Sequence, residues 1–367
     1  MNQPLRPADD AAVPASGQTQ TQGGQAQTHG SPGQRQDQDQ AQDQAQADAT
    51  LPPVRPRRPP PPGPRLLQVT HETCYDYDAP VEVAHHSAWL RPRDTEVQKV
   101  QRWDLQIDPL PESAVQESKD AFGNWRHGFS HSRVHDRLTV TSRFQVLLTT
   151  PPQLDDAHSP PWEEAAAALR YRAGVTQPEA VEFVLPSQFA PHAPELAAYA
   201  HDLFSPGRPL LQGAQALMTR VHQRMQYKPH STDVATNALQ ALAQGQGVCQ
   251  DFAHLMIAAL RSLGLAARYV SGYLLTHPPE GQPRLVGADA RHAWVAVWCP
   301  LHGWVALDPT NDVRVGQDHV TLAWGRDYAD VAPLRGVIRG GGAALASVAV
   351  TVQPVDAPPG SGTSAPA

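Results

Sequence analysis

The period of the hydrophobic pattern changes along the chain, and these changes limit the fold more than any other feature of the sequence. Between Leu66 and about Leu148, apolar and polar residues alternate, as in RLTVTSRFQVLL (137–148), and Gly, Pro and Asp separate the alternating runs. This pattern predicts antiparallel strands and hence a small β domain. From about 150 to 240, apolar residues recur every three or four positions instead, which predicts helices.

A further helix and three strands are predicted in the second half of the chain. Cys249 opens a stretch with one apolar stripe that ends at Gly264, a residue type that commonly follows a helix C-terminus. Alternation then returns in AARYVSGYLL (266–275), HAWVAVW (292–298) and WVALD (304–308), which predicts strands. The chain therefore carries a helix directly before a set of strands.

The two ends of the chain differ in composition from the rest. Residues 1–64 hold a Gln, Asp and Ala run, QRQDQDQAQDQAQADA, followed by a Pro- and Arg-rich segment. Such composition offers too little apolar surface to offset the entropy of ordering, so we predict that this leader is disordered. The tail 354–367, rich in Pro, Gly and Ser, is predicted to be disordered as well. Pro59–Pro62 favour polyproline II and are a candidate ligand for a Pro-recognising module, although a solvated spacer is the commoner role of such a segment.

Charge and cysteine usage exclude several classes of function. The formal charge of −7 provides no basic surface for nucleic acid, so no nucleic-acid partner is expected. No stretch approaches about 18 consecutive apolar residues, and the first residues lack the apolar core of a secretory signal, so we expect neither a membrane partner nor export. Three cysteines, Cys74, Cys249 and Cys299, do not make a disulfide framework. A cytoplasmic location is therefore expected.

Cys249 lies in GQGVCQDFAHLM, where a Gly-containing loop passes into the predicted helix. The unpaired N–H groups and the positive dipole end of a helix N-terminus stabilise a thiolate and can hold the oxyanion of a tetrahedral intermediate. Most lone cysteines are instead small buried apolar residues, and this structural role is the one we expect for Cys74 and Cys299. Cys249 is a candidate nucleophile provided that a base lies beside it.

His292 begins one predicted strand, and Asp308 ends the next. The short connection CPLHG between the strands predicts an antiparallel hairpin. A hairpin symmetric about Pro300 sets His292 opposite Asp308, with both on the same face. An imidazole beside a carboxylate is the pair that orients a base for a thiol nucleophile. Cys249, His292 and Asp308 are thus a candidate catalytic triad, in which the imidazole holds the proton of the thiol.

The other histidines are weaker candidates for chemistry. Neither HExxH nor CxxC nor another ligand-spaced pair occurs, and the neighbours His85 and His86 would point to opposite faces of a strand. No metal site or cofactor is therefore expected. His254 lies five residues after Cys249 and points away from it on the helix, which favours packing over a role as the base.

These segments resemble the transglutaminase-like superfamily, in its bacterial branch with a transglutaminase-like N-terminal region. The similarity spans about residues 66–353. It is carried by TDVATNALQALAQGQGVCQDFAHLMIAALRSLGLAARYVSGYLL (232–275), DARHAWVAVWCPLHGWVALDPTND (289–312) and RDYADVAPLRGV (326–337), and by THETCYDYDAPV, LRPR and DAFGN nearer the N-terminus.

The resemblance implies an α+β fold, with an N-terminal antiparallel β domain followed by a papain-like core in which the nucleophile helix packs on an antiparallel sheet. We accordingly assign residues 66–150 to the β domain and residues 151–353 to a helical linker and the catalytic core. By matching motif positions, the resemblance makes Cys249 the nucleophile, His292 the base and Asp308 the residue that orients it.

The resemblance also implies a cysteine-dependent enzyme that hydrolyses or transfers acyl groups at amide bonds of a peptide or protein substrate, through a thioester. Tyr227 matches an aromatic residue that often lies near the site and is a candidate substrate contact. Two positions depart from the family pattern and bear on substrate contacts: Arg291 stands where a small residue is expected, and Ala296 where an acidic residue is frequent.

Two other functions remain open at this point. One is a non-enzymatic binding or scaffold protein that keeps the fold, and the other is acyl transfer from a thioester donor to a small amine. The presence of all three triad residues favours an enzyme over a scaffold.

Overall fold

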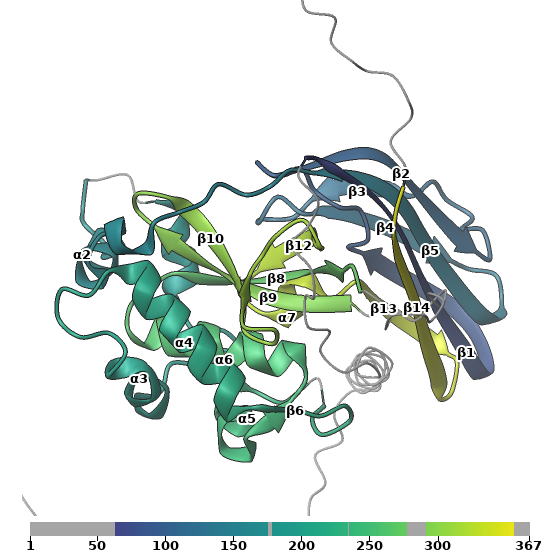
Figure 1. Cartoon of the computed structure of the whole chain (residues 1–367). Helices are drawn as coiled ribbons and strands as arrows, with labels where there is room; N and C mark the ends of the chain where they lie inside the picture. Colours follow the sequence, from purple (N-terminus) through teal and green to yellow (C-terminus); the bar gives the residue numbers. More distant parts are fainter. Residues whose placement is uncertain (1–62, 175–177, 234, 277–290, 356–367) are drawn as a thin grey trace, which may run out of the picture.

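The computed structural model describes residues 63–174, 178–233, 235–276 and 291–355. The predicted disorder of most of the leader and of most of the tail, as well as the Pro59–Pro62 segment, lies outside these residues. Figure 1 shows a curled antiparallel sheet beside a second part in which helices pack on a smaller sheet. The predicted α+β class is therefore confirmed.

One long strand organises the first of these parts. β1 (Arg65–Ala88) pairs with β5 and β14 along its first half and with β4 and β13 along its second half. The described residues form a seven-stranded sheet in which β2-β5-β1-β4-β3 are successive neighbours. The other strands are β2 (Gln98–Asp108), β3 (Gln116–Lys119), β4 (Trp125–His131), β5 (His135–Leu148), β13 (Leu334–Gly340) and β14 (Ala344–Pro354).

The ends of this sheet differ from the domain division that we expected. β13 and all but the last residue of β14 fall within the segment 151–353, yet they pair with β1 rather than with the sheet that follows α6. Pro354, the first residue of the predicted disordered tail, is the last residue of β14. The physical reason is the length of β1: β4 and β5 leave one edge of each half unpaired, and β13 and β14 cover it. Val350 and Val352 are buried as a result. Residues from the C-terminal end thus complete the N-terminal sheet.

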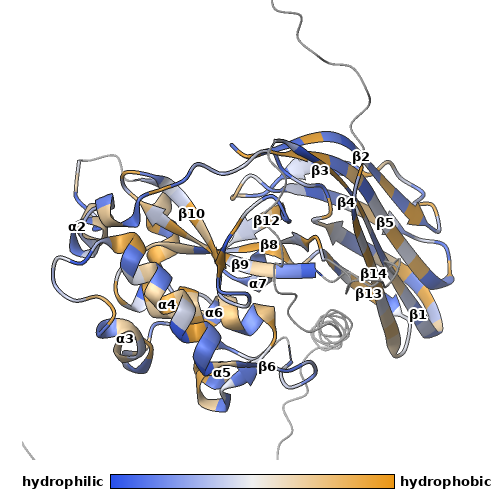
Figure 2. Ribbon diagram, in the orientation of Figure 1, coloured by the Kyte–Doolittle hydropathy of each residue, from blue (hydrophilic) through white to orange (hydrophobic). Residues whose placement is uncertain are grey.

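α6 (Cys249–Ser262) is the central helix of the second part. Its residues from Gln250 to Arg261 are all buried, as expected for a helix surrounded by protein on every side. It packs on β8 and β9 and is covered by α3, α4 and α5 (Figure 1). Figure 2 shows hydrophobic residues along α4 and α6 and along the strands that they cover. The predicted nucleophile helix is thus seated on a sheet.

Here the described residues form a five-stranded antiparallel sheet in the order β11-β10-β9-β8-β12. Its strands are β8 (Ala267–Leu274), β9 (Arg291–Cys299), β10 (Gly303–Asp308), β11 (Val313–Arg314) and β12 (His319–Gly325). The helices around it are α2 (Trp162–Ala168), α3 (Pro194–His201), α4 (Leu210–Arg224), α5 (Ala238–Gln244) and α7 (Tyr328–Val331). A short parallel pair, β6 (Gln226–Tyr227) and β7 (Gln246–Gly247), precedes α6.

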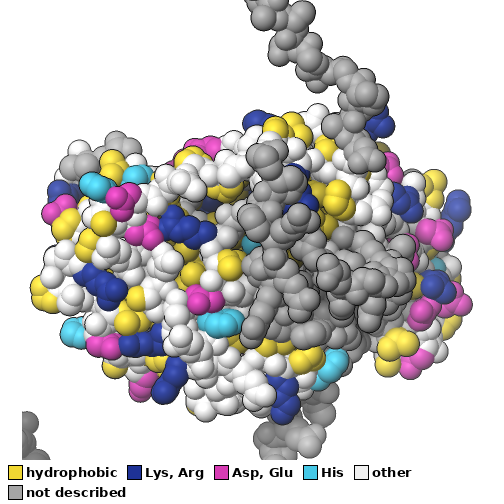
Figure 3. Space-filling view, in the orientation of Figure 1, with side chains coloured by type: hydrophobic (Ala, Val, Ile, Leu, Met, Phe, Trp, Pro, Cys, Tyr) yellow, Lys and Arg dark blue, Asp and Glu magenta, His cyan; other side chains and the backbone are white. Residues whose placement is uncertain are grey.

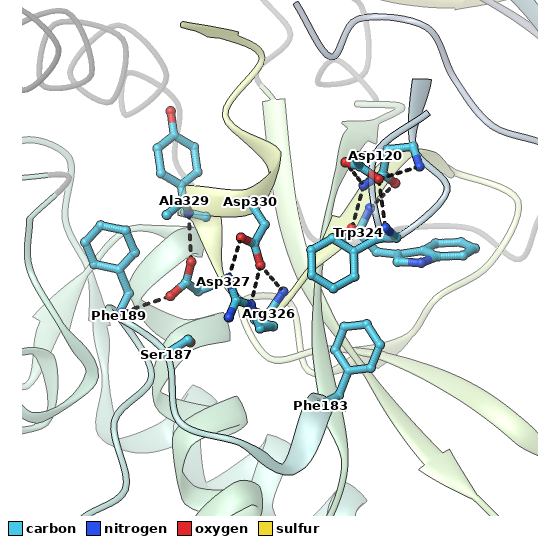
Figure 4. A network of polar contacts seen from close by, with 12 residues as sticks. Asp120, Phe183, Ser187, Phe189, Trp324, Arg326, Asp327, Ala329 and Asp330 are labelled. Carbon is cyan, nitrogen blue, oxygen red and sulfur yellow. Dashed lines mark hydrogen bonds and ion pairs between the residues drawn. The ribbon is translucent and has the colours of Figure 1, made fainter. Parts of the chain in front are cut away.

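The turn between β3 and β4 joins the two parts. Asn124 donates its side-chain amide to the carbonyl of Trp324 at 2.8 Å and accepts the Trp324 N–H at 3.0 Å, while Asp120 accepts from the same amide at 2.9 Å. Nearby, the carboxylate of Asp327 accepts the N–H of Phe189 at 3.0 Å (Figure 4). The bonds of Asn124 fix β12 against the first sheet, and the bond of Asp327 fixes the start of α7 to the segment before α3.

Positive and negative side chains are interspersed over the face shown in Figure 3. Among the helices that the structure describes, none is both long enough and apolar enough to span a membrane. The expected cytoplasmic location and the expected lack of nucleic-acid and membrane partners stay predictions.

Candidate active site

The loop before Cys249 is held by a buried carboxylate. Cys249 is half-buried and is the first residue of α6. Asp251 is 1 % exposed, and its Oδ2 accepts the N–H of Val248 at 2.8 Å and the hydroxyl of Thr232 at 2.7 Å. A Cβ on Gly247 would lie 2.5 Å from this carboxylate, so the turn requires glycine there. Burial raises the pKa of the Asp251 carboxyl to about 6.

The β9–β10 hairpin brings His292 to Asp308, as predicted, but with another register. Continued by one residue, the pairing sets Asp308 opposite Trp294 rather than opposite His292. Three residues (300–302) connect the strands and Gly303 adopts φ +67°, so the centre of the hairpin is shifted. Because the register differs by two residues, the two side chains still share a face. His292 and Asp308 are diagonal neighbours on the two adjacent strands, and His292 Nε2 lies 2.7 Å from Asp308 Oδ2.

The carboxylate of Asp308 is fully buried, and both of its oxygens accept hydrogen bonds. Oδ1 accepts the N–H groups of Thr310 at 3.0 Å and Asn311 at 3.3 Å, and Oδ2 accepts the Asn311 amide at 2.8 Å as well as the two imidazoles of His292 and His319. Burial alone would raise the pKa of this carboxyl, but the charges and hydrogen bonds of the two histidines hold it well below its usual range. Asp308 is therefore an anion in the folded protein.

His292 lies between Asp308 and Cys249. Burial opposes its protonation, but the charge and hydrogen bond of Asp308 and the hydrogen bond with Cys249 outweigh burial and raise its pKa to about 10. Because Nε2 is engaged by the carboxylate, Nδ1 is the nitrogen that remains for the thiol. The structure thus brings together the three residues that the sequence singled out, with the imidazole in the middle.

His319 is a fourth member of this cluster, and the sequence analysis missed it. It is 7 % exposed, its Nδ1 accepts the Gly316 N–H at 3.3 Å, and its Nε2 lies 3.1 Å from Asp308 Oδ2. Because Nδ1 accepts, Nε2 carries the proton and donates it to the carboxylate. One signal was present in the sequence: HVTLAWG begins with a histidine and alternates, as HAWVAVW does.

The ligand atoms of His292, Asp308 and His319 lie within 4.8 Å of one another, a spacing that would allow a metal ion. Both Nε2 atoms, however, point at the same carboxylate oxygen, at 2.7 and 3.1 Å. These are hydrogen-bond distances, whereas two ligands about 2.0–2.2 Å from a tetrahedral metal stand roughly 3.3 Å or more apart. The arrangement fits a carboxylate that orients two imidazoles.

Tyr227 lies on β6, which pairs with β7 two residues before Cys249. Its ring is half-buried and stands 6.4 Å from that of Phe252. It therefore lies beside the nucleophile segment, and its role as a substrate contact stays a prediction.

His254 packs in the core, as expected. It is fully buried, stacks on Phe189 at 5.3 Å and accepts the Tyr328 N–H at 3.1 Å. Cys74 and Cys299 are also buried, consistent with a structural role.

The two departures from the family pattern lie on β9. Ala296 is 2 % exposed and belongs to a small apolar cluster on the second sheet, together with Val270 and Trp294. The guanidinium of Arg291 stands 5.9 Å from the ring of Tyr328, next to the first turn of α7. Of the two departures, only Arg291 therefore lies next to His292, at the start of β9.

Comparison with known proteins agrees with this architecture. Residues 197–309, which contain Cys249, His292 and Asp308, match the sequence model of the transglutaminase-like superfamily, and residues 67–147 match that of the bacterial transglutaminase-like N-terminal region. The chain belongs to the transglutaminase-like superfamily. The predicted family is thus confirmed.

Relatives of this superfamily member differ in how much of its length they share. The uncharacterized protein Rv2569c of Mycobacterium tuberculosis is 40 % identical over 283 residues, which are 75 % of this chain and 88 % of that protein. A Pseudomonas aeruginosa protein named protein-glutamine gamma-glutamyltransferase is 33 % identical over 132 residues, covering 33 % of this chain and 20 % of that one. A solved structure from Cytophaga hutchinsonii, described as a candidate cysteine protease, aligns with TM-score 0.63 at 19 % identity over 80 % of this chain and 92 % of that one, and so shares the fold.

Proposed function

We propose that this protein is an enzyme that uses Cys249 to break an amide bond in a peptide or protein substrate and passes the acyl group to water or to an amine. The observation that carries the proposal is the series Cys249–His292–Asp308, in which His292 is bonded to Asp308 at 2.7 Å and the nearby Cys249 helps to raise its pKa, with the sulfur at the N-terminus of a buried helix. Each member has the neighbour that its role requires.

The chemistry follows from the order of the three groups. Asp308 fixes the proton on Nε2 of His292, so Nδ1 takes the proton of the thiol and a thiolate–imidazolium pair results. The thiolate attacks the carbonyl carbon, and the N–H groups at the start of α6 face the oxyanion that forms. When the C–N bond breaks, His292 gives its proton to the leaving amine, and a thioester remains on Cys249.

The second half of the reaction removes the acyl group. Water or a second amine loses a proton to His292 as it attacks the thioester, and the thiol is released. The Pseudomonas relative is named for γ-glutamyl transfer from glutamine, which supports amine transfer as one outcome. Hydrolysis and transfer share the same thioester, so the acceptor decides between them.

Alkylation of the three cysteines tests the proposal. Treatment with iodoacetamide between about pH 6 and 8, followed by mass mapping, should label Cys249 selectively, because Cys74 and Cys299 are buried and serve as internal controls. In the variant His292→Ala, the rate at pH 7 should fall at least about tenfold, since the imidazolium that stabilises the thiolate is gone.

The exposed His192 provides a matched control, because its side chain bonds only the carbonyl of Val184 among the described contacts. His192→Ala should label like the unmodified protein. Slow and equal labelling of all three cysteines would instead favour a scaffold that keeps the fold without the activity.

A further inference from the structure

A cavity of about 430 Å³ lies in the first sheet, between the segments 91–94 and 100–103 and the β3–β4 turn. Four cations, Arg91, Arg93, Arg102 and Lys119, line it against one carboxylate, Asp94. Its volume is within the range of ligand sites, roughly 300–1,000 Å³. We call it the edge pocket. A concentration of positive charge in a chain of net charge −7 points to an anionic ligand.

Two of these cations form no ion pair with a carboxylate in the described part of the chain. Arg102 and Lys119 are exposed, and neither has a carboxylate partner within the described ranges, whereas Arg91 pairs with Glu117 and Asp94 with Lys99. The charges of Arg102 and Lys119 are therefore not neutralised by a carboxylate of the protein.

The aromatic lining is already covered by cations. Arg91 lies 5.0 Å from the centre of the Trp103 ring and 4.0 Å from that of Trp125, and Lys119 lies 4.6 Å from Trp125. These contacts are cation–π interactions, and they occupy ring faces on which a base or a sugar would otherwise stack. The pocket is thus better suited to carboxylates than to nucleotides.

The backbone around the pocket favours a polypeptide ligand. β2 and β3 are the two ends of the strand path, so in the described part of the chain each pairs with a neighbour along one side only. Four consecutive residues of β2, Val100–Trp103, line the cavity. The pairing of β2 with β5 is irregular between Val100 and Arg102, and this irregularity brings consecutive residues of the edge strand to the cavity. The Val100 N–H is already bonded to Asp94 Oδ1 at 2.9 Å, so an added strand can pair with this edge only beyond Val100.

The floor of the pocket is rigid. Arg93 donates to the carbonyl of Phe122 at 3.0 Å and to Asn124 Oδ1 at 2.7 Å, and its guanidinium lies 3.1 Å from the centre of the Trp324 ring. Through Asn124 and Trp324 the floor is bonded to β12 of the second sheet. A ligand in the edge pocket would therefore lie at the joint between the two sheets.

We propose that the edge pocket binds an extended acidic segment of a partner polypeptide, which pairs its backbone with β2 and sets its carboxylates against Arg102 and Lys119. This binding goes beyond the proposed function, because it needs no chemistry at Cys249. It provides a means of holding an acidic stretch of a protein beside the second sheet.

Calorimetric titration of the full chain with an octapeptide of alternating Glu and Val tests the proposal. The double variant Arg102→Gln/Lys119→Gln should bind it about tenfold more weakly, since two surface charge pairs are lost. The matched double variant Arg133→Gln/Arg339→Gln removes two exposed cations elsewhere and should change the affinity less than about twofold. Alkylation of Cys249 should be the same in both, which separates this test from that of the proposed function.

Three further ligands decide what the pocket recognises. An octapeptide of Gln and Val tests the charge, and the Glu–Val peptide with alternate backbone nitrogens methylated tests the strand pairing; both should bind at least about tenfold more weakly. Tripolyphosphate should compete poorly. Undiminished binding of the methylated peptide, displacement of the peptide by tripolyphosphate at similar concentration, or an equal loss in the control variant would overturn the proposal.

Discussion

The Asp308 carboxylate orients two imidazoles, one of which lies against the nucleophile. The identities of Cys249, His292 and Asp308 could be predicted because each stands at a recognisable boundary of an element: the start of a helix, the start of a strand and the end of a strand. His319 also begins a strand, yet nothing in the local pattern shows that β12 returns to the same carboxylate. Local periodicity predicts elements but not which of them meet.

We expect His319 to act as a positioning residue for Asp308. In His319→Leu, the carboxylate loses one donor, so its hold on His292 loosens and alkylation of Cys249 at pH 7 should slow about tenfold. His319→Gln keeps a donor and should restore most of the rate. The rate should be measured across pH together with thermal unfolding. A leucine variant that is less stable but keeps the full pH profile of alkylation would make His319 purely structural.

At the scale of elements, the start of α6 and the limits of β9 and β10 agree with the sequence, while the hairpin register does not. The alternating pattern fixes which face of the sheet a residue occupies. It was therefore predictable that His292 and Asp308 lie on the same face. The register depends on the conformation of the loop, where Gly303 takes a positive φ, and a stretch such as CPLHG allows several loop lengths.

The turn before α6 should tolerate no side chain at Gly247. In Gly247→Ala, the new Cβ would lie 2.5 Å from the Asp251 carboxylate, which must move and release the Val248 N–H. We expect a loss of about 1–3 kcal/mol in the free energy of unfolding, measured with urea, and slower alkylation of Cys249. Gly316→Ala, where the added Cβ meets open space, should change neither. Equal stability of the two variants would contradict this account of the turn.

At the scale of the whole molecule, the N-terminal sheet is closed by strands from the far end of the described chain, for example where Val69 pairs with Val352. The periods of the hydrophobic pattern marked the strands and helices. The assignment of β13 and β14 to the first sheet could not be predicted, because their pattern is that of any strand and only the unpaired edge of β1 specifies their place.

Stability should fall in mild acid, because three histidines are buried in neutral form. Burial lowers the pKa of His71 and His86 to about 3 and that of His254 to about 4. In the unfolded chain histidine titrates near about 6.5, so below that pH the unfolded state binds more protons and each histidine costs roughly 2 kcal/mol at pH 5. Asp251, with its raised pKa, acts in the opposite direction by a smaller amount.

Urea unfolding at pH 7 and pH 5 measures this effect as a shift in midpoint. We expect the free energy of unfolding to be several kcal/mol lower at pH 5 than at pH 7. In the variant His86→Gln, this decrease between pH 7 and pH 5 should be smaller than in the unmodified protein. A stability that is constant over this interval would show that the buried histidines are not neutral in the folded state.

The central claim is that Cys249 forms a thioester with the help of His292, and direct observation of the acyl group tests it. The protein should be mixed with p-nitrophenyl acetate and analysed by intact mass and peptide mapping. We expect a burst of one nitrophenol per chain, one acetyl group on Cys249 that hydroxylamine removes, and a rate roughly a hundredfold lower in His292→Ala. Acetylation of other residues only, or an equal rate in the His292 variant, would contradict the account.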